Sequence, residues 1–172
     1  AHLHIEVARD CVAFKKNMVT ASYISDEMKS LDALAKENGV LLLNEIGLDP
    51  GIDHMSAMKI FDKIHADGGK IISFKSHCGG LVAPESDDNP WHYKISWNPR
   101  NIVLAGQSGA VYKENNEIKR ITYQDLFNSS TEVAFEGLES LAFYPNRDSL
   151  SYIPTYKLAD TPTFIRTTLR HV

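Results

Sequence analysis

The chain has 172 residues, of which 43% are hydrophobic and 23% are charged, and its net charge is −4. These proportions are ordinary for a soluble globular protein, and the acidic balance argues against a general nucleic-acid binder. No apolar run approaches the roughly 18 residues of a membrane span. The length fits one sizeable domain or two small ones, and we expect neither a nucleic-acid nor a membrane partner.

The two cysteines, Cys11 and Cys78, have neither the spacing of a metal site nor the density of a disulfide-rich protein. They predict a reducing, cytoplasmic location and no metal centre. The first residues, AHLHIEVARD, lack the pattern of a signal peptide, which agrees with that prediction.

The first 46 residues predict the alternation of helices and strands that is typical of a doubly wound parallel sheet. Ser25 is a candidate N-cap for the second helix, which Asn38-Gly39 would end. The apolar run VLLLNEI is typical of a parallel strand buried on both faces. The expected elements are a helix at 4–15, a strand at 17–22, a helix at 26–37 and a strand at 40–46.

A complete dinucleotide-binding domain begins with a strand and a Gly-rich turn, G-x-G-x-x-G. This sequence has no such fingerprint and begins within a helical pattern. We therefore expect it to be the middle of a longer protein whose phosphate-binding half lies outside this sequence.

After residue 46 the pattern changes to α+β, which places a domain boundary near residues 46–50. The hairpin pattern indicates a mixed, largely antiparallel sheet. The expected elements are a helix at 50–66 ended by Gly68-Gly69, a strand at 70–78, a loop at 78–90, a strand at 93–97, a short helix at 98–107, a hairpin at 110–122 around Asn115-Asn116, and strands at 140–144 and 163–172.

The stretch LDPGIDHM begins the helix expected after residue 46. Asp49 followed by Pro50 predicts an N-cap and a first helical residue. However, the end of a parallel strand that opens onto a helix N-terminus is also where open α/β sheets bind ligands. Asp49 is therefore either a cap or a ligand-facing carboxylate, while His54, one turn further on, is typical of a structural histidine.

Other stretches are less specific when each is taken alone. Cys78 is typical of a small buried side chain, and the Gly79-Gly80 pair that follows permits close backbone approach. Arg147, in the turn-like stretch PNRDSL, and Arg170, in TLR, are each typical of a solvated charge. Two arginines from different loops also suit carboxylate recognition, because the guanidinium fork matches a carboxylate.

Seven stretches, taken together and in order, resemble the glutamate-forming saccharopine dehydrogenases (saccharopine reductases), a family also found as the C-terminal half of bifunctional aminoadipic semialdehyde synthases. The stretches are VTASY (19–23), NEIGLDPGIDHM (44–55), SHCGG (76–80), APESDDNP (83–90), YKISW (93–97), YPNRDS (144–149) and TLR (168–170). Two motifs depart from the family pattern. SYCGG is SHCGG here, with His77 at the Tyr position, and GTLRY is TTLRH, with Thr167 for Gly and His171 for Tyr.

The resemblance implies an α/β (α+β) fold with two parts. Residues 1–46 would be the C-terminal part of an NAD(P)-binding Rossmann-like domain, without its Gly-rich loop. Residues 47–172 would be part of a substrate-binding and dimerisation domain, with a mixed, largely antiparallel sheet flanked by helices. It also implies NAD or NADP as cofactor and a homodimer.

The resemblance further implies roles for individual residues. The implied catalytic residues are Asp49, Tyr23 and Cys78. The implied substrate-binding residues are Ser22, Tyr23, Asp49, Arg147, Thr168, Leu169 and Arg170. The implied cofactor-binding residues are Ser22, Leu48, Asp49, Pro50, Gly51, Ile52, Asp53, His54, Met55 and Asn98.

The implied reaction interconverts saccharopine with L-glutamate and 2-aminoadipate 6-semialdehyde by hydride transfer to or from NAD(P). Saccharopine joins lysine to glutarate through a secondary amine and carries three carboxylates, two of which suit Arg147 and Arg170. Asp49 would either accept the proton of that amine or favour its cationic form. Two other functions stay open: a related dehydrogenase of lysine or of a carboxylated polyamine, and, for the chain by itself, an inactive dimerising substrate-binding module.

Overall fold

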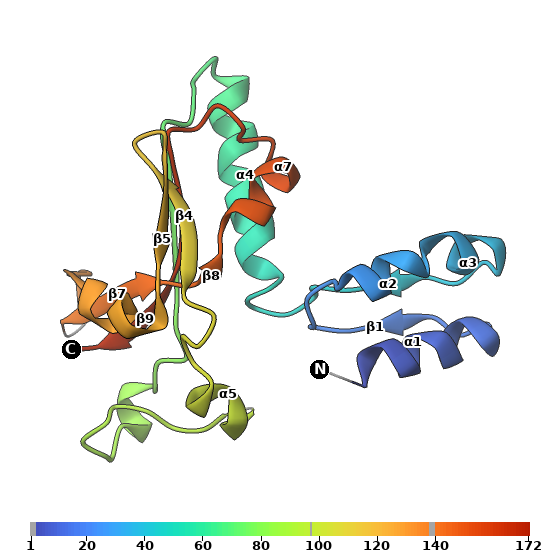
Figure 1. Cartoon of the computed structure of the whole chain (residues 1–172), viewed down its shortest axis with the longest axis horizontal. Helices are drawn as coiled ribbons and strands as arrows, with labels where there is room; N and C mark the ends of the chain where they lie inside the picture. Colours follow the sequence, from blue (N-terminus) through green and yellow to red (C-terminus); the bar gives the residue numbers. More distant parts are fainter. Residues whose placement is uncertain (1–2, 97, 138–139) are drawn as a thin grey trace. The chain divides into compact units, whose positions relative to one another are not determined.

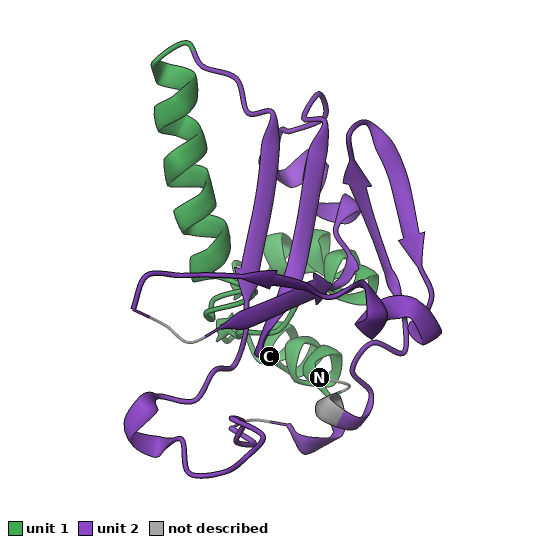
Figure 2. Cartoon of the chain, turned by 90° about the vertical axis from the view of Figure 1, so that its left-hand side faces the viewer, with its two compact units in different colours: residues 1–68 green, residues 69–172 purple. Residues whose placement is uncertain are grey.

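The computed structural model describes residues 3–96, 98–137 and 140–172. The chain forms two compact units, residues 1–68 and residues 69–172, which Figure 2 shows in different colours. Both units combine helices with strands, so the expected α/β (α+β) class is confirmed.

Figure 1 shows the elements in chain order. The helices are α1 (His4–Ala13), α2 (Asp26–Ser30), α3 (Asp32–Glu37), α4 (Ile52–Ala66), α5 (Pro99–Val103), α6 (Tyr123–Leu126) and α7 (Ile153–Tyr156), with short 3-10 turns at Pro84–Ser86, Phe127–Ser129 and Leu150–Tyr152. The strands are β1 (Met18–Val19), β2 (Leu42–Leu43), β3 (Ser73–Cys78), β4 (Ala110–Glu114), β5 (Glu117–Ile121), β6 (Thr131–Val133), β7 (Leu141–Pro145), β8 (Arg147–Asp148) and β9 (Thr163–His171). Within the described residues, none of these helices has the length and apolar character needed to cross a bilayer.

The first unit has the helix–strand–helix–strand order that its sequence predicts. β1 and β2 pair in parallel, and α2 and α3 connect them. Ser25 caps α2, because its hydroxyl accepts a hydrogen bond from the Met28 amide at 3.1 Å. The single helix expected at 26–37 is divided at Leu31, which ends α2 and begins α3.

The strand expected at 40–46 is shorter and less buried than its apolar run predicts. Only Leu42–Leu43 pair as a strand. Val40 is buried against α1 and α3, whereas Leu41 and Leu43 are exposed. The prediction of burial on both faces was wrong for the described residues, because α1 and α3 cover one face of this pleated segment and its alternate side chains point the other way.

The start of α4 also differs from its prediction. The helix begins at Ile52 with Gly51 as its N-cap, so Asp49 does not cap it, and the Asp49-Pro50 peptide bond is cis. Gly51 has a φ of 150°, and a Cβ on it would lie 2.1 Å from the Gly47 carbonyl oxygen. The chain therefore turns at a position that only glycine can occupy, and this turn delays the helix beyond Pro50.

The second unit is built on a seven-stranded sheet, as far as the described residues show. The strands follow the order β5-β4-β9-β7-β6, with β3 joined to β9 and β8 joined to β4. The pairs β3–β9 and β4–β8 are parallel and the others are antiparallel. The prediction of a mixed, largely antiparallel sheet is confirmed.

β9 lies at the centre of this sheet and is its longest strand. β3 pairs with its first part, from Ser73 opposite Thr163 to Cys78 opposite Thr168. β7 pairs with its last part, where Ala142 lies opposite Arg170. Because side chains alternate along a strand, Cys78, Thr168 and Arg170 belong to one face.

The same face is covered near the start of β9 by aromatic side chains. Phe74 of β3 and Phe164 of β9 both contact the ring of Tyr156 from α7, with centroids 5.4 and 5.7 Å apart. Phe164 and Tyr156 are almost fully buried. This packing covers the face near the start of β9. At the other end, Tyr93, from the loop that follows β3, packs on Arg170.

The predicted hairpin at 110–122 and the predicted strand at 93–97 had different outcomes. The hairpin expected at 110–122 is confirmed, and Asn115 and Asn116 both have the positive φ that its tight turn requires. The strand expected at 93–97 was wrong, because residues 93–96 are irregular, while Trp97 lies outside the described residues. The aromatic pattern there reflects the packing of Tyr93 on Arg170, with a centroid distance of 5.3 Å, rather than strand pairing.

Gly79 offers a direct test of how closely β3 and β9 approach. A Cβ on Gly79 would lie 2.1 Å from the Leu169 carbonyl oxygen, whereas a Cβ on Gly80 would meet no atom within 4 Å. We expect Gly79→Ala to destabilise the protein by more than about 2 kcal/mol and Gly80→Ala to change its stability by less than about 0.5 kcal/mol. Urea unfolding midpoints of the two variants check this, and equal midpoints would contradict the close approach.

Candidate functional site

The first unit brings together two of the predicted site residues, Tyr23 and Asp49. The Tyr23 hydroxyl donates a hydrogen bond to Asp49 Oδ1 at 2.9 Å. Tyr23 follows β1 and Asp49 lies in the turn before α4, so the bond joins the ends of two parallel strands. This is the edge at which a parallel sheet binds ligands.

A second polar cluster at the same edge centres on Glu45. Glu45 Oε1 accepts a hydrogen bond from the Ile24 amide at 3.0 Å, and Glu45 Oε2 lies 3.2 Å from His54 Nε2. The other ring nitrogen of His54 lies 3.6 Å from Asp53 Oδ2. Asp53 Oδ1 accepts a hydrogen bond from the Gly51 amide at 2.7 Å. The cluster therefore fixes the turn that carries Asp49, which agrees with a structural role for His54.

Ser22 is held by a residue that the sequence analysis did not single out. Its hydroxyl lies 2.9 Å from Nδ1 and 3.1 Å from Nε2 of His4. His4 begins α1, 18 residues earlier in the chain, and no motif connects the two positions. The contact orients Ser22 beside Tyr23.

The start of α4 also presents an apolar surface. Leu48, Ile52 and Met55 are each more than half exposed, at 66%, 55% and 56%, while Pro50 and Gly51 are buried. Ile52 and Met55 are one helical turn apart and therefore share a face. Such a surface beside polar groups suits a planar ring with a polar substituent, such as nicotinamide.

The second unit places Cys78, Thr168 and Arg170 on one face of the β3–β9 pair, as described above. Arg170 Nη1 donates to the Leu169 carbonyl at 2.9 Å, and its guanidinium lies over the Tyr93 ring. No ion pair involves Arg170 among the described residues. The Leu169 side chain is buried on the opposite face. A ligand on the face of Arg170 could therefore contact only the backbone of Leu169.

The loop before Tyr93 is fastened to the end of β9 by a second contact. His92 Nδ1 lies 2.5 Å from Asp87 Oδ2, and the ring of His92 lies 5.0 Å from that of His171. Asn89 Nδ2 donates to the Tyr93 carbonyl at 3.1 Å. These contacts hold the loop where Tyr93 meets Arg170. They come from residues far apart in the sequence, so no pattern predicts them.

Arg147 and Asn98 lie apart from this face. Arg147 belongs to the two-residue strand β8, is exposed, and has a positive φ of 47°. The segment around it is tied to β9, because the Asn146 amide donates to the Arg166 carbonyl and the Arg166 amide donates to Ser149 Oγ, both at 2.9 Å. Asn98 is exposed, and its side chain accepts a hydrogen bond from the Arg100 amide at the start of α5.

Two of the departures from the family pattern contact each other. His77 Nδ1 lies 2.7 Å from Thr167 Oγ1, and Thr167 Oγ1 donates to the Ser76 carbonyl at 3.2 Å. Thr167 therefore accepts from His77, whose ring also contacts Phe143 at 4.4 Å. Both side chains lie on the face opposite Cys78. The two replacements form one packed pair beneath the strand that carries Cys78 and Thr168.

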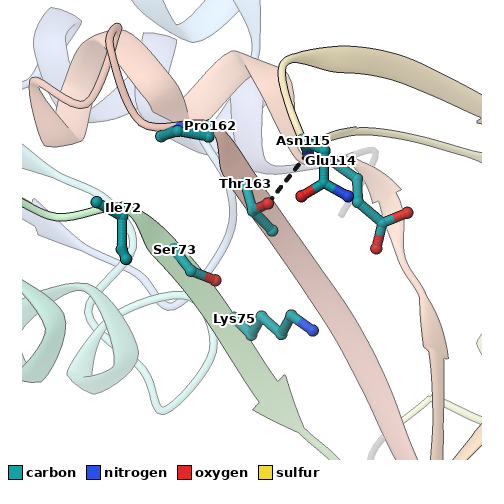
Figure 3. Close-up of a pocket in the computed structure, with 7 residues that line it drawn as sticks. All are labelled: Ile72, Ser73, Lys75, Glu114, Asn115, Pro162 and Thr163. Atoms are coloured by element: carbon teal, nitrogen blue, oxygen red, sulfur yellow. Dashed lines mark hydrogen bonds between the residues drawn. The ribbon is translucent and has the colours of Figure 1, made fainter.

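A hollow of about 460 Å³ lies at the other end of the β3–β9 pair (Figure 3). It contains none of the predicted site residues. Figure 3 shows Lys75 from β3 and Glu114 from β4 beside it, together with the hydrogen bond from the Asn115 amide to Thr163 Oγ1. Its lining residues are Ile72, Ser73, Lys75, Glu114, Asn115, Pro162 and Thr163.

The model of the saccharopine dehydrogenase C-terminal domain family matches residues 47–172. The chain belongs to this family. An alpha-aminoadipic semialdehyde synthase of Arabidopsis thaliana is 44% identical over 99% of this chain and 16% of its own length. A saccharopine dehydrogenase [NADP(+), L-glutamate-forming] of Saccharomyces cerevisiae is 40% identical over 98% of this chain and 38% of its own length.

A solved structure agrees with these relatives. The apo histidine-tagged saccharopine dehydrogenase (L-Glu forming) from Saccharomyces cerevisiae has a TM-score of 0.89 and 39% identity, covering 99% of this chain and 38% of its own. The resemblance expected from the seven stretches is therefore confirmed. This chain spans less than two fifths of these relatives' length. The related synthases of Rattus norvegicus, Mus musculus and Bos taurus are named mitochondrial.

His77 predicts a pH dependence of stability. Burial, and then the positive charge of Lys75, lowers the pKa of His77 below its ordinary value. In the unfolded chain a histidine binds a proton at about pH 6.5, whereas in the folded protein His77 binds it only at a lower pH. The unfolded state therefore gains protons first, and the free energy of unfolding decreases as the pH falls below that value. We expect His77→Gln to make this fall shallower in urea unfolding followed from neutral to mildly acidic pH. An unchanged slope would contradict the assignment.

The contact between Asp87 and His92 predicts a second effect. We expect Asp87→Ala to speed amide hydrogen exchange at residues 89 and 91–93 about fivefold, because the partly buried contact with His92 anchors that loop. Asp88→Ala is a matched control, since the Asp88 side chain is 72% exposed against 17% for Asp87 and forms a surface pair with Lys94. Equal exchange in the two variants would show that Asp87 does not anchor the loop.

Proposed function

We propose that this chain supplies the substrate-binding part of an NAD(P)-dependent saccharopine dehydrogenase. The enzyme interconverts saccharopine with L-glutamate and 2-aminoadipate 6-semialdehyde. The observation that carries the proposal is the face shared by Cys78, Thr168 and Arg170, where the Arg170 guanidinium lies on Tyr93 and enters no ion pair within the described part of the chain. A guanidinium held in this way is suited to a substrate carboxylate.

The carboxylates of the substrate explain the two predicted arginines. Arg147 and Arg170 each bind one carboxylate of saccharopine through a guanidinium fork. A substrate held at two points has a fixed orientation, which brings its central C–H toward the cofactor. Thr168 is a further substrate-binding residue in this proposal. Its side chain is on the same face as Arg170, and its hydroxyl can donate a hydrogen bond to the bound substrate.

Proton transfer falls to the first unit. We propose that Asp49 accepts a proton from the cationic form of the secondary amine, because the amine must be neutral before hydride leaves. Water then hydrolyses the resulting imine, which breaks the C–N bond and releases glutamate and the semialdehyde. The hydrogen bond from Tyr23 holds the Asp49 carboxylate in one orientation, while Ser22 and Cys78 help to orient the substrate. Neither Asp49 nor Tyr23 changes the hydride chemistry, which the cofactor supplies.

The cofactor, NAD or NADP, would lie against the residues from Leu48 to Met55. The exposed apolar side chains of Leu48, Ile52 and Met55 fit a nicotinamide ring, and Ser22 and Asn98 offer polar groups for its amide and ribose. Asp53 and His54, which take part in the cluster around Glu45, would hold this turn against the cofactor. The name of the fungal relative makes NADP the first cofactor to assay.

We further propose that residues 1–46 belong to a Rossmann-like cofactor domain and residues 47–172 to the substrate domain. The match of the family model from Gly47 supports this boundary. Val19, Leu41 and Leu43 are exposed on the small parallel sheet, and parallel sheets are normally covered on both faces. The remainder of a doubly wound domain would provide that cover. By compactness, α4 groups with the first unit.

A homodimer formed through the sheet of the second unit completes the proposal. β5 lies at one end of the strand order, and within the described residues it pairs only with β4. Ile118, in the middle of β5, is half exposed. An unpaired strand edge of this kind favours pairing with a second copy. Light scattering that gives a monomer mass at high concentration would argue against the dimer.

We infer a reducing compartment, because neither Cys11 nor Cys78 forms a disulfide. The cytoplasm is our prediction, and the mitochondrial matrix is the alternative that the names of the mammalian relatives raise. Cell fractionation with an antibody against this chain distinguishes the two compartments.

The substrate proposal predicts the effect of removing either arginine. In the full-length enzyme, we expect Arg147→Ala and Arg170→Ala each to raise the KM for saccharopine by about tenfold or more, because each loses a charged hydrogen-bonded pair. The KM for the cofactor should stay within about twofold. Arg9→Ala, which removes an exposed arginine paired with Glu6 on α1, is the control. An unchanged saccharopine KM in both variants would show that the substrate is wrong.

A further inference from the structure

One loop of the second unit supplies the ring on which the Arg170 guanidinium lies. The central carbon of that guanidinium is 5.3 Å from the centroid of the Tyr93 ring, which is within the roughly 6 Å of a cation–π contact. Arg170 Nη1 also donates to the Leu169 carbonyl at 2.9 Å. The guanidinium has several N–H groups, and this hydrogen bond uses a single one. Neither contact neutralises Arg170, so within the described residues its charge and its other donors are left for a carboxylate.

The ring contact restrains a side chain that would otherwise be mobile. Arg170 is only partly buried, so its outer atoms have room to move. A long side chain loses rotamer freedom when it binds a ligand, and this loss weakens binding. The bidentate pairing of a guanidinium with a carboxylate also requires one orientation of the group. A ring that holds the guanidinium before the ligand arrives therefore favours binding.

Tyr93 is itself held by a tight turn. The His92 amide donates to the Asn89 carbonyl at 3.1 Å, and Pro90 follows Asn89, where proline favours a turn. The Asn89 side chain then bridges the loop. Its Oδ1 accepts a hydrogen bond from the Trp91 amide and its Nδ2 donates to the Tyr93 carbonyl, both at 3.1 Å. The backbone that carries Tyr93 is thus fixed on both sides of His92.

The loop also contacts two consecutive residues of β9. Tyr93 packs on Arg170, and the ring of the preceding residue, His92, lies 5.0 Å from that of His171. Asp87 Oδ2 lies 2.5 Å from His92 Nδ1, which holds the His92 ring in place. Because neighbouring residues of the loop contact neighbouring residues of the strand, two contacts set the position of Tyr93 along β9.

We propose that Tyr93 is a positioning residue for substrate binding, whose ring holds the Arg170 guanidinium in the orientation that a substrate carboxylate needs. The proposal rests on the proposed function and names the group that orients Arg170. Tyr93 acts through Arg170 and makes no bond to the substrate. The face of the ring carries the role, so phenylalanine can replace Tyr93, whereas an aliphatic side chain of similar size cannot.

The test measures saccharopine oxidation by the full-length enzyme. We expect Tyr93→Leu to raise the KM for saccharopine about fivefold, because the cation–π contact is lost. Tyr93→Phe should keep this KM within about twofold, since it retains the ring. In both variants kcat and the KM for the cofactor should stay within about twofold. Trp91→Leu is the control, because it removes a ring from the same turn at a position that is 82% exposed, and it should change neither KM.

A double-mutant cycle separates this role from a structural one. Without the Arg170 guanidinium the ring has nothing to orient, so Tyr93→Leu should raise the saccharopine KM of Arg170→Ala by less than about twofold. The proposal is overturned by an unchanged KM in Tyr93→Leu, by equal rises in Tyr93→Leu and Tyr93→Phe, by the same rise in Trp91→Leu, or by a full fivefold rise in the Arg170→Ala background. If Tyr93→Leu does not fold, Tyr93→Met replaces it with the same expectation.

A binding measurement distinguishes failure of this proposal from failure of the proposed function. If the unaltered enzyme does not oxidise saccharopine, the proposed function is wrong, and calorimetry with glutarate as a carboxylate probe decides the role of Tyr93. Glutarate binding that is weaker in Arg170→Ala and in Tyr93→Leu, but not in Tyr93→Phe, supports the positioning role. Equal binding in Tyr93→Leu and Tyr93→Phe, or no binding by the unaltered enzyme, overturns it.

Discussion

The in-register parallel pairing of β3 with β9 is the constraint on which the second unit depends. It joins residues about ninety positions apart, as in the contact between His77 and Thr167. It also decides which side chains share a face. A shift of one residue would send Cys78 to the face opposite Thr168 and Arg170. Gly79 allows the chain to continue past this pair, since its α-carbon lies against the Leu169 carbonyl. The candidate substrate site is therefore a consequence of strand register.

Charge is distributed over this framework in an unusual way. Within the described residues, the lysines that form ion pairs lie in exposed pairs, such as those of Lys29 and Lys36 with aspartates on their own helices. Such pairs contribute little to stability. Arg120, Arg147 and Arg170 instead have no carboxylate partner within the described residues. Arg170 is held by an aromatic ring and a backbone carbonyl. An arginine held in this way supports the proposal that its guanidinium binds a substrate carboxylate.

The departures from the family pattern are coupled through contacts. His77 replaces a tyrosine and Thr167 a glycine, and the two side chains form one hydrogen-bonded pair. His171 replaces another tyrosine, and its ring packs on His92, which is fastened to Asp87. Both sets lie next to the strand segment Thr168 to Arg170 without replacing any residue in it. The local packing has changed while the groups proposed to bind substrate have stayed the same.

The secondary structure was largely predictable because hydrophobic periodicity and capping residues are local. Ser25, the Asn115-Asn116 turn and the long helix before Gly68 all followed from neighbouring residues. The errors arose where a distant contact competed with the local pattern. Of the two interpretations of Asp49, the helix cap was wrong, because Gly51 turns the chain first and Asp49 accepts a hydrogen bond from Tyr23. The alternation near Tyr93 predicted a strand, yet that ring packs on Arg170.

By itself, the sequence determined the class of fold, the order of most elements and, through seven short stretches, the family. Those properties depend on residue type and spacing along one chain. Only the tertiary structure decided that Cys78, Thr168 and Arg170 share a face, and that Glu45 and His4 support Asp49 and Ser22 respectively within their own unit. The physical reason is that strand register and side-chain contact join positions that no local pattern connects.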